Sequence, residues 1–219
     1  MTEPATVTLL KCRALLFDCD GVLVDSMGSV TAAWTRWAVE LGLDPGAVNS
    51  LVHGRRSVDT VAMVVPEEHR AERLARIDRY EIEDAATVRA IPGAAALLAS
   101  LPADRWAVVT SGRADLALAR LRAAGLPRPD ALVTADDVAQ GKPDPEGYRT
   151  AAARLGVPPA GTVVIEDMPV GMTAARSAGA GAVVGVGEKA LVGGADVVVP
   201  DLRWLRWTGE GLEVRAAPA

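Results

Sequence analysis

The chain has 219 residues, of which half are hydrophobic but only 4% aromatic, and its formal net charge is −5. This length and composition are typical of a globular protein with a sizeable core, and they exclude a disordered or fibrous chain. Cys12 and Cys19 are too few for a disulfide framework, and there is no basic run, leader pattern or apolar stretch of about eighteen residues, so we expect a cytoplasmic protein without nucleic-acid or membrane partners.

Short, valine-rich apolar runs recur along the chain, and such runs are typical of strands that are buried on both faces. They lie at residues 13–17, 106–110, 131–134, 162–166, 182–186 and 196–199. Helical patterns that stop at Gly125, Gly156 and Gly179 lie between several of them. This alternation predicts an α/β protein with a doubly wound parallel sheet.

Residues 26–90 interrupt this alternation. Apolar side chains from Val30 to Leu41 recur with helical spacing until Gly42, and residues 66–84 form a charge-dense pattern that indicates a largely exposed helix. No convincing strand is recognisable in this part of the chain. We interpret residues 26–90 as an inserted α-helical cap domain, and residues 1–25 and 91–219 as the α/β catalytic core domain.

Polar side chains follow the ends of the predicted strands, where ligands of an open parallel sheet bind. They are Asp18 and Asp20 after the first strand, Thr110, Ser111 and Gly112 after the second, Lys142 after the third, and Glu166 and Asp167 after the fourth. Carboxylates this close together repel one another unless a cation holds them, and oxygen ligands without His or Cys favour Mg²⁺. We therefore predict a magnesium site that shares its ion with a phosphate group.

Four segments carry a family resemblance. "FDCDGVLVDS", "VVTSG", "GKPDP" and "VVIEDMPVGMTAARSAGA" resemble, in this order, the four motifs of the haloacid dehalogenase superfamily in its magnesium-dependent phosphatase branch. The resemblance spans residues 13 to about 185. It implies a Rossmann-type core with a helical cap, and the hydrolysis of a small phosphomonoester through an aspartyl-phosphate.

The resemblance also implies catalytic roles. Asp18 would be the nucleophile, and Asp20 the general acid that later acts as the base for the hydrolytic water. Thr110 and the amides of Ser111 and Gly112 would hold the transferring phosphoryl group. Lys142 would neutralise charge on the nucleophile and on that phosphoryl group.

For the metal, the resemblance implies an oxygen of Asp18, the backbone carbonyl of Asp20 and the side chain of Asp167 as ligands, with Glu166 acting through a metal-bound water. Met168 is a departure, because many relatives have serine at this position. A missing hydroxyl there would alter hydrogen bonds around the metal without removing a ligand.

The most informative stretch of the predicted cap is "LVHGRRSVDT" at residues 51–60. A turn at Gly54 followed by Arg55 and Arg56 resembles the specificity loop of sugar- and polyol-phosphatases in the family. The arginines would bind substrate oxygens or a second phosphate; the alternative is that one of them pairs with Asp59 on the surface.

We therefore predict that the protein is a phosphatase whose substrate is a small phosphorylated metabolite, most simply a sugar or polyol phosphate. We expect it to be a monomer or a weak homodimer. A β-phosphoglucomutase-like phosphotransferase is an alternative, although Val30 occupies the place of the expected cap histidine and Ser57 that of the loop arginine. Phosphoglycolate phosphatase is another alternative. A non-catalytic phosphate-binding regulator would be a different class of protein, which would not need the complete set of acids and lysine.

Overall fold

The computed structural model describes residues 7–215, and its centre is a six-stranded parallel sheet. The strand order is β6-β5-β2-β7-β8-β9. The strands are β2 (Ala14–Phe17), β5 (Trp106–Val109), β6 (Ala131–Val133), β7 (Thr162–Glu166), β8 (Ala182–Val186) and β9 (Val197–Val199). Each coincides with one of the six apolar runs, and the predicted fold class is confirmed.

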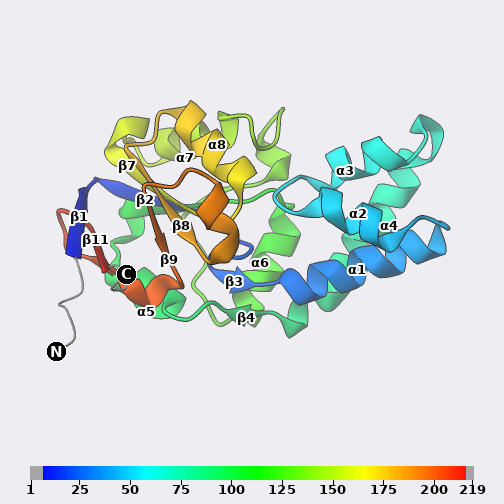
Figure 1. Ribbon diagram of the computed structural model, residues 1–219, viewed down its shortest axis with the longest axis horizontal. Coiled ribbons are helices and arrows are strands. Elements are labelled where there is room, and N and C mark those ends of the chain that lie inside the picture. Colours follow the sequence, from blue (N-terminus) through cyan, green and yellow to red (C-terminus); the bar gives the residue numbers. More distant parts are fainter. Residues whose placement is uncertain (1–6, 216–219) are drawn as a thin grey trace.

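Helices cover both faces of this sheet (Figure 1). The helices α5 (Ala94–Ser100) and α6 (Ala114–Ala123) pack on one face, and α7 (Glu146–Arg154) and α8 (Pro169–Ala178) pack on the other. Because side chains alternate along a strand, Leu15 and Phe17 of β2 join the cluster on the α5 and α6 side, while Leu16 joins the opposite cluster. Both faces of the strands are therefore buried, as valine-rich runs require.

A second, antiparallel sheet of three strands was not predicted. It consists of β1 (Val7–Lys11), β11 (Gly211–Arg215) and β10 (Leu205–Trp207), in the order β1-β11-β10. Leu205, Leu212 and Val214 add their side chains to the cluster on the α5 face. This sheet extends the core and joins the two ends of the described chain.

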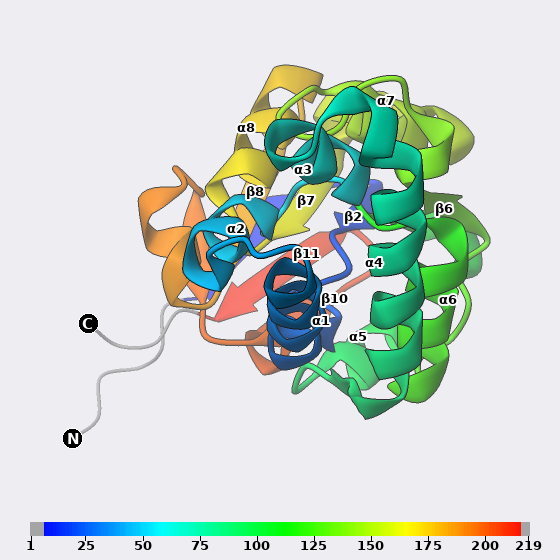
Figure 2. The same ribbon diagram turned by 90° about the vertical axis from the view of Figure 1, so that its right-hand side faces the viewer.

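The helices between β3 (Val24–Asp25) and β4 (Arg89–Ala90) surround a hydrophobic cluster of their own. They are α1 (Met27–Glu40), α2 (Pro45–Val52), α3 (Ser57–Val64) and α4 (Arg70–Asp84). Figure 1 shows them together at one end of the molecule, and in Figure 2 they face the viewer. Trp34 and Trp37 pack edge to face in this cluster, with ring centroids 5.3 Å apart. The exact extent of a cap domain remains a prediction.

Two details of this segment correct the sequence interpretation. Residues 89–90 form a short strand that pairs antiparallel with β3, whereas no strand was expected within residues 26–90. The charged helix α4 begins at Arg70, after a 3₁₀ turn, and it buries Ile77, Tyr80 and Glu81. It is therefore not simply an exposed helix. Within residues 7–215, no helix has the length and apolar character needed to cross a membrane.

Candidate active site

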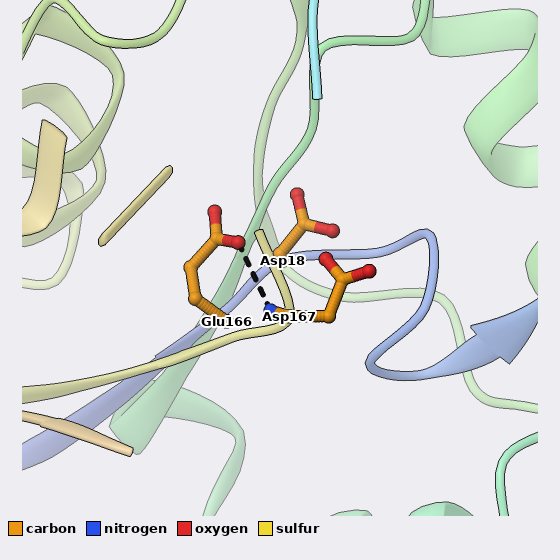
Figure 3. Close-up of side chains that lie close together, drawn as sticks. All are labelled: Asp18, Glu166 and Asp167. Carbon is orange, nitrogen blue, oxygen red and sulfur yellow. Dashed lines mark hydrogen bonds between the residues drawn. The ribbon is translucent and has the colours of Figure 1, made fainter. Parts of the chain in front are cut away.

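Three acidic side chains meet where β2 and β7 end. Asp18 follows β2, Glu166 ends β7, and Asp167 comes next; one carboxylate oxygen from each lies within 4.8 Å of the others. The backbone N–H of Asp18 donates to the carbonyl of Ile165 at 3.0 Å, which places the two strand ends side by side. Figure 3 shows the three carboxylates directed toward the same space. All three residues are buried, so this cluster is suited to hold a divalent cation.

Lys142 lies within this acidic cluster. Its Nζ donates to Oδ1 of Asp18 and, at 2.6 Å, to Oε1 of Glu166, and its side chain is only 7% exposed. Burial alone would lower the pKa of Lys142, but the carboxylates of Asp18 and Glu166 raise it well above its ordinary value. The lysine is therefore a fixed positive charge beside the expected nucleophile.

Glu166 is held by more donors than its neighbours. Besides Lys142, the hydroxyl of Tyr148 donates to its Oε1 at 2.6 Å, and the backbone amides of Asp167 and Met168 donate to its Oε2 at 3.1 and 3.3 Å. A Cβ atom at position 171 would lie 1.8 Å from Oε1 of Glu166, so only glycine leaves room for this carboxylate. Glu166 is thus fixed in a position where it orients Lys142. Its contact with a metal ion through a water molecule stays a prediction.

The electrostatics of the cluster call for a cation. Burial raises the pKa of Asp18 well above its ordinary value, although Lys142 acts in the opposite direction. Burial, reinforced by the charge of Glu166, raises the pKa of Asp167 to about 7. Buried carboxylates that repel one another are costly unless a positive charge compensates them. The single positive charge of Lys142 cannot compensate three carboxylates, and a divalent ion would supply the missing positive charge.

The loop after Asp20 passes close to this cluster. Gly21 has a φ of +88°, and a Cβ there would lie 2.2 Å from Oδ2 of Asp167. Glycine is therefore required both for the left-handed backbone and for the approach to the carboxylate. This turn keeps the backbone of Asp20 next to Asp167, where the carbonyl of Asp20 was predicted to bind the metal.

Asp20 accepts hydrogen bonds from two other parts of the chain. Its Oδ1 accepts from the hydroxyl of Ser26 at 2.6 Å and from Nη1 of Arg120 at 3.0 Å. Its Oδ2 lies 3.5 Å from Oγ1 of Thr110. Sequence reasoning did not identify Arg120. The sequence did contain a signal for it, because Arg120 lies on the apolar face of the helical pattern of α6, next to Leu121.

Three of the four predicted phosphate-binding residues line the same cavity. Ser111 and Gly112 line it together with Asp18, Asp20 and Lys142. Thr110 is buried and does not line this cavity; its Oγ1 instead accepts the N–H of Gly112 at 3.0 Å. Thr110 therefore orders the loop at Ser111 and Gly112, and the predicted role of the Gly112 amide in phosphate binding is not supported, because that N–H is already donated to Thr110.

The structure separates the two arginines of the specificity loop. Gly54 and Arg55 line the cavity, and the Gly54 carbonyl accepts the Ser111 hydroxyl at 3.0 Å. Arg56 lies outside it, where its Nε and Nη2 donate to the carboxylate of Asp59 at 2.8 and 2.9 Å. The pairing with Asp59 that was considered for one arginine is thus made by Arg56, while Arg55 lines the cavity with its Nη1 3.5 Å from Sδ of Met63.

The parallel sheet, with its acidic cluster and Lys142 at the strand ends, is the arrangement of one class of hydrolases. The family model for haloacid dehalogenase-like hydrolases matches residues 12–179, and the chain belongs to this family. It is 39% identical over 175 residues to hexitol phosphatase A of Escherichia coli, covering 78% of this chain and 81% of the relative.

Two further matches extend this relation. Glycerol-1-phosphate phosphohydrolase 2 of Saccharomyces cerevisiae is 34% identical over 182 residues, covering 78% of this chain and 73% of the relative. The crystal structure of CbbY from Rhodobacter sphaeroides in complex with phosphate superimposes with a TM-score of 0.74 at 26% identity, covering 87% and 95% of the two chains. The chain is therefore similar to these proteins over both the sheet and the helical segment.

The acidic cluster leads to a prediction about metal binding. Addition of Mg²⁺ at about 100 times its Kd should stabilise the protein by about 2.7 kcal/mol, which for a chain of this size raises Tm by about 5–10 °C. Asp167→Asn should remove most of this shift, because it deletes a ligand charge. Differential scanning fluorimetry with and without Mg²⁺ measures the effect. Asp104→Asn, on the exposed surface, is the control, and an unchanged shift in Asp167→Asn would exclude Asp167 as a ligand.

Proposed function

We propose that the protein is a magnesium-dependent phosphatase that hydrolyses a small sugar or polyol phosphate. The observation that carries this proposal is the ion pair between Lys142 and Asp18 at the base of a cavity that also contains Asp20. A buried carboxylate with a fixed cation beside it and a second carboxylic acid two residues further on is suited to phosphoryl transfer. The related hexitol and glycerol-1-phosphate phosphatases support the substrate class.

In the proposed reaction, a carboxylate oxygen of Asp18 attacks phosphorus and the ester bond to the leaving alcohol breaks. Asp20 gives its proton to the departing alkoxide, and the product of this step is an aspartyl-phosphate. Asp20 then takes a proton from water, which attacks the aspartyl-phosphate and releases inorganic phosphate and free Asp18. Lys142 and the amide at Ser111 stabilise the negative charge of the phosphoryl group throughout.

The oxygen ligands of the acidic cluster fit Mg²⁺. Asp18 and Asp167, with the backbone carbonyl of Asp20, would hold it. When bound, the ion neutralises phosphoryl charge and aligns the phosphoryl group with Asp18. Tyr148 and the amides after Glu166 keep that carboxylate, and with it Lys142, in place for the same purpose.

We also propose that residues 26–90 act as a cap that excludes water and selects the substrate. The helical segment contributes apolar walls to the cavity from Val30, Trp34 and Val52, and polar groups from Arg55 and Ser57. A ligand with a short carbon chain and several hydroxyl groups matches this mixed surface. The position of Val30 favours hydrolysis over phosphoryl transfer between sugar positions, because valine has no group that could exchange a proton.

The two loop arginines provide a sharp test of the cap. Arg55→Gln should raise KM by about 10-fold or more, because a hydrogen bond to a charged group contributes about 1.5–3 kcal/mol. Arg56→Gln is the matched control; it should leave KM unchanged, since Arg56 is occupied by Asp59 and by the carbonyls of Val138 and Ala139. Steady-state kinetics on the preferred substrate measures both. Equal effects of the two substitutions on KM would contradict the assignment of Arg55.

Phosphate release tests the proposed function directly. Purified protein with Mg²⁺ would be assayed against hexitol, glycerol, sugar and short-acid phosphates, with an EDTA-treated sample as control. We expect preferred release from a polyol or sugar phosphate, lost in EDTA. No release from any substrate by folded, Mg²⁺-binding protein would contradict hydrolysis, and glucose 1-phosphate isomerisation and phosphate binding would be tested next.

A further inference from the structure

A buried ionic bridge connects Asp20 with the helical segment. Arg120 of α6 donates from Nη1 to Oδ1 of Asp20 at 3.0 Å and from Nη2 to Oε1 of Glu81 at 3.1 Å. The side chains of Arg120 and Glu81 are only 4% and 6% exposed. The bridge thus joins three elements: the loop after β2, helix α6 and helix α4.

Such a bridge is not explained by stability alone. Removing charged groups from water is expensive, and well-packed apolar side chains in place of a buried ion pair are often no less stable. Here two carboxylates share a single guanidinium, and Nε of Arg120 is buried without a hydrogen-bond partner among residues 7–215. Burial raises the pKa of Glu81, against the effect of Arg120. The arrangement therefore has an energetic cost, and its benefit must lie in what it orders.

The bridge orders one specific oxygen atom. Oδ1 of Asp20 accepts from both Arg120 and Ser26, so this oxygen is occupied on two sides. Within the described residues 7–215, Oδ2 has one long contact, with the hydroxyl of Thr110 at 3.5 Å. The two donors therefore hold Oδ1 in place and leave Oδ2 as the less occupied oxygen. Asp20 is thereby fixed in a single rotamer with one oxygen available for proton transfer.

We propose that Arg120 is a positioning residue that holds Asp20 for proton transfer, with Glu81 anchoring the guanidinium from the helical segment. The proposal rests on the proposed function, in which Asp20 exchanges protons with the leaving group and with water. Glu81 also accepts the hydroxyl of Ser57, the first residue of α3, at 3.1 Å. Ser57 follows the loop that carries Arg55, so the anchor also contacts the residue next to the specificity loop.

The test compares two leaving groups. Glycerol 1-phosphate releases an alkoxide that needs a proton, whereas 2,4-dinitrophenyl phosphate releases a phenolate that needs none. Arg120→Met should slow the first turnover of glycerol 1-phosphate by about 100-fold, the lower end of what general acid catalysis contributes, and should change the first turnover of the dinitrophenyl ester little. Rapid-quench measurement of the first turnover isolates this step from the later hydrolysis, in which Asp20 also takes part.

Three variants complete the design. Arg122→Met, an exposed arginine on the same helix, is the control and should affect neither substrate. Arg120→Lys should restore part of the glycerol 1-phosphate rate, because it keeps a donor near Asp20. If Arg120→Met fails to fold, Arg120→Met combined with Glu81→Gln removes both buried charges of the pair and should show the same selectivity. If Arg120→Met lowered the first-turnover rates of both substrates equally, Arg120 would have only a structural role and the proposal would be wrong. Unchanged rates on both substrates would also overturn it.

A measurement without turnover separates this proposal from the proposed function. In a double-mutant cycle of urea unfolding, Asp20→Ala and Arg120→Met should be non-additive, because each removes the other's partner. Additive effects would overturn the proposal even in an active enzyme. A wild-type protein that hydrolyses neither ester but shows non-additivity would contradict only the proposed function, leaving the contact between Arg120 and Asp20 established.

Discussion

Asp18→Asn is expected to lower kcat by at least about 10⁴-fold, as the loss of a covalent nucleophile does in other enzymes. An amide oxygen does not attack phosphorus to form a stable acyl-phosphate, and Glu166, which also contacts Lys142, is already bound by Tyr148 and two backbone amides. Phosphate release under saturating substrate and Mg²⁺ measures the effect. Acid quenching of the wild type should trap phosphate on the protein, and the variant should trap none.

This substitution should leave the fold intact. Asp18 is a buried acid whose pKa is raised by burial, so a neutral amide at this position removes a repulsive charge among the acids. Asp130→Asn, at an exposed position, is the matched control and should retain full activity. If Asp18→Asn retained between about 10⁻⁴ and 10⁻² of the wild-type kcat, a general acid–base role worth 10²–10⁴-fold would fit better than a nucleophile, and a smaller loss would contradict any direct role in the chemistry.

Lys142→Met is expected to affect both activity and stability. It leaves Asp18 and Glu166 buried without their cation, and breaking a buried ion pair by removing one partner costs about 3–5 kcal/mol. This loss should appear in urea unfolding in EDTA, and it should be smaller with Mg²⁺, because the ion compensates part of the missing charge. We also expect kcat to fall by about 10²–10³-fold, comparable to the loss of a donor that stabilises transition-state charge.

Lys11→Met supplies the comparison for this variant, because Lys11 is exposed on β1. It should change neither the free energy of unfolding nor kcat. If Lys142→Met were as stable as wild type in EDTA, the ion pairs of Lys142 with Asp18 and Glu166 would make no net contribution to the free energy of unfolding.

The sheet was predictable because its strands are buried on both faces and therefore appear as continuous apolar runs. The small antiparallel sheet was not predictable, because β1 is mostly exposed and its composition resembles that of a surface segment. The partners of β1 and β10 lie on β11, and pairing between Val7 and Arg215 joins opposite ends of the chain. No local pattern specifies such a distant register.

The candidate site likewise contains some residues that could be predicted from the sequence and others that could not. Residues at strand ends, such as Asp18 and Asp167, could be placed from sequence because parallel strands end at one edge of a sheet. Arg120 and Glu81 could not, because their contact joins two helices 39 positions apart in sequence, and Arg120 reaches Asp20 across 100. Which of Arg55 and Arg56 faces the cavity likewise depended on tertiary contacts, here on Asp59 and the carbonyl of Val138.

The short ladder between β3 and β4 has a consequence for how such a protein can diversify. Val24 pairs with Ala90 and Asp25 with Arg89, so the chain leaves the core and returns to it at adjacent points. A tight turn could join these two strands as readily as a helical segment does. The intervening helices can therefore be exchanged, lengthened or lost in one recombination event without shifting the register of the sheet. The helical segment and the sheet that carries Asp18 are in this way separable parts of one sequence.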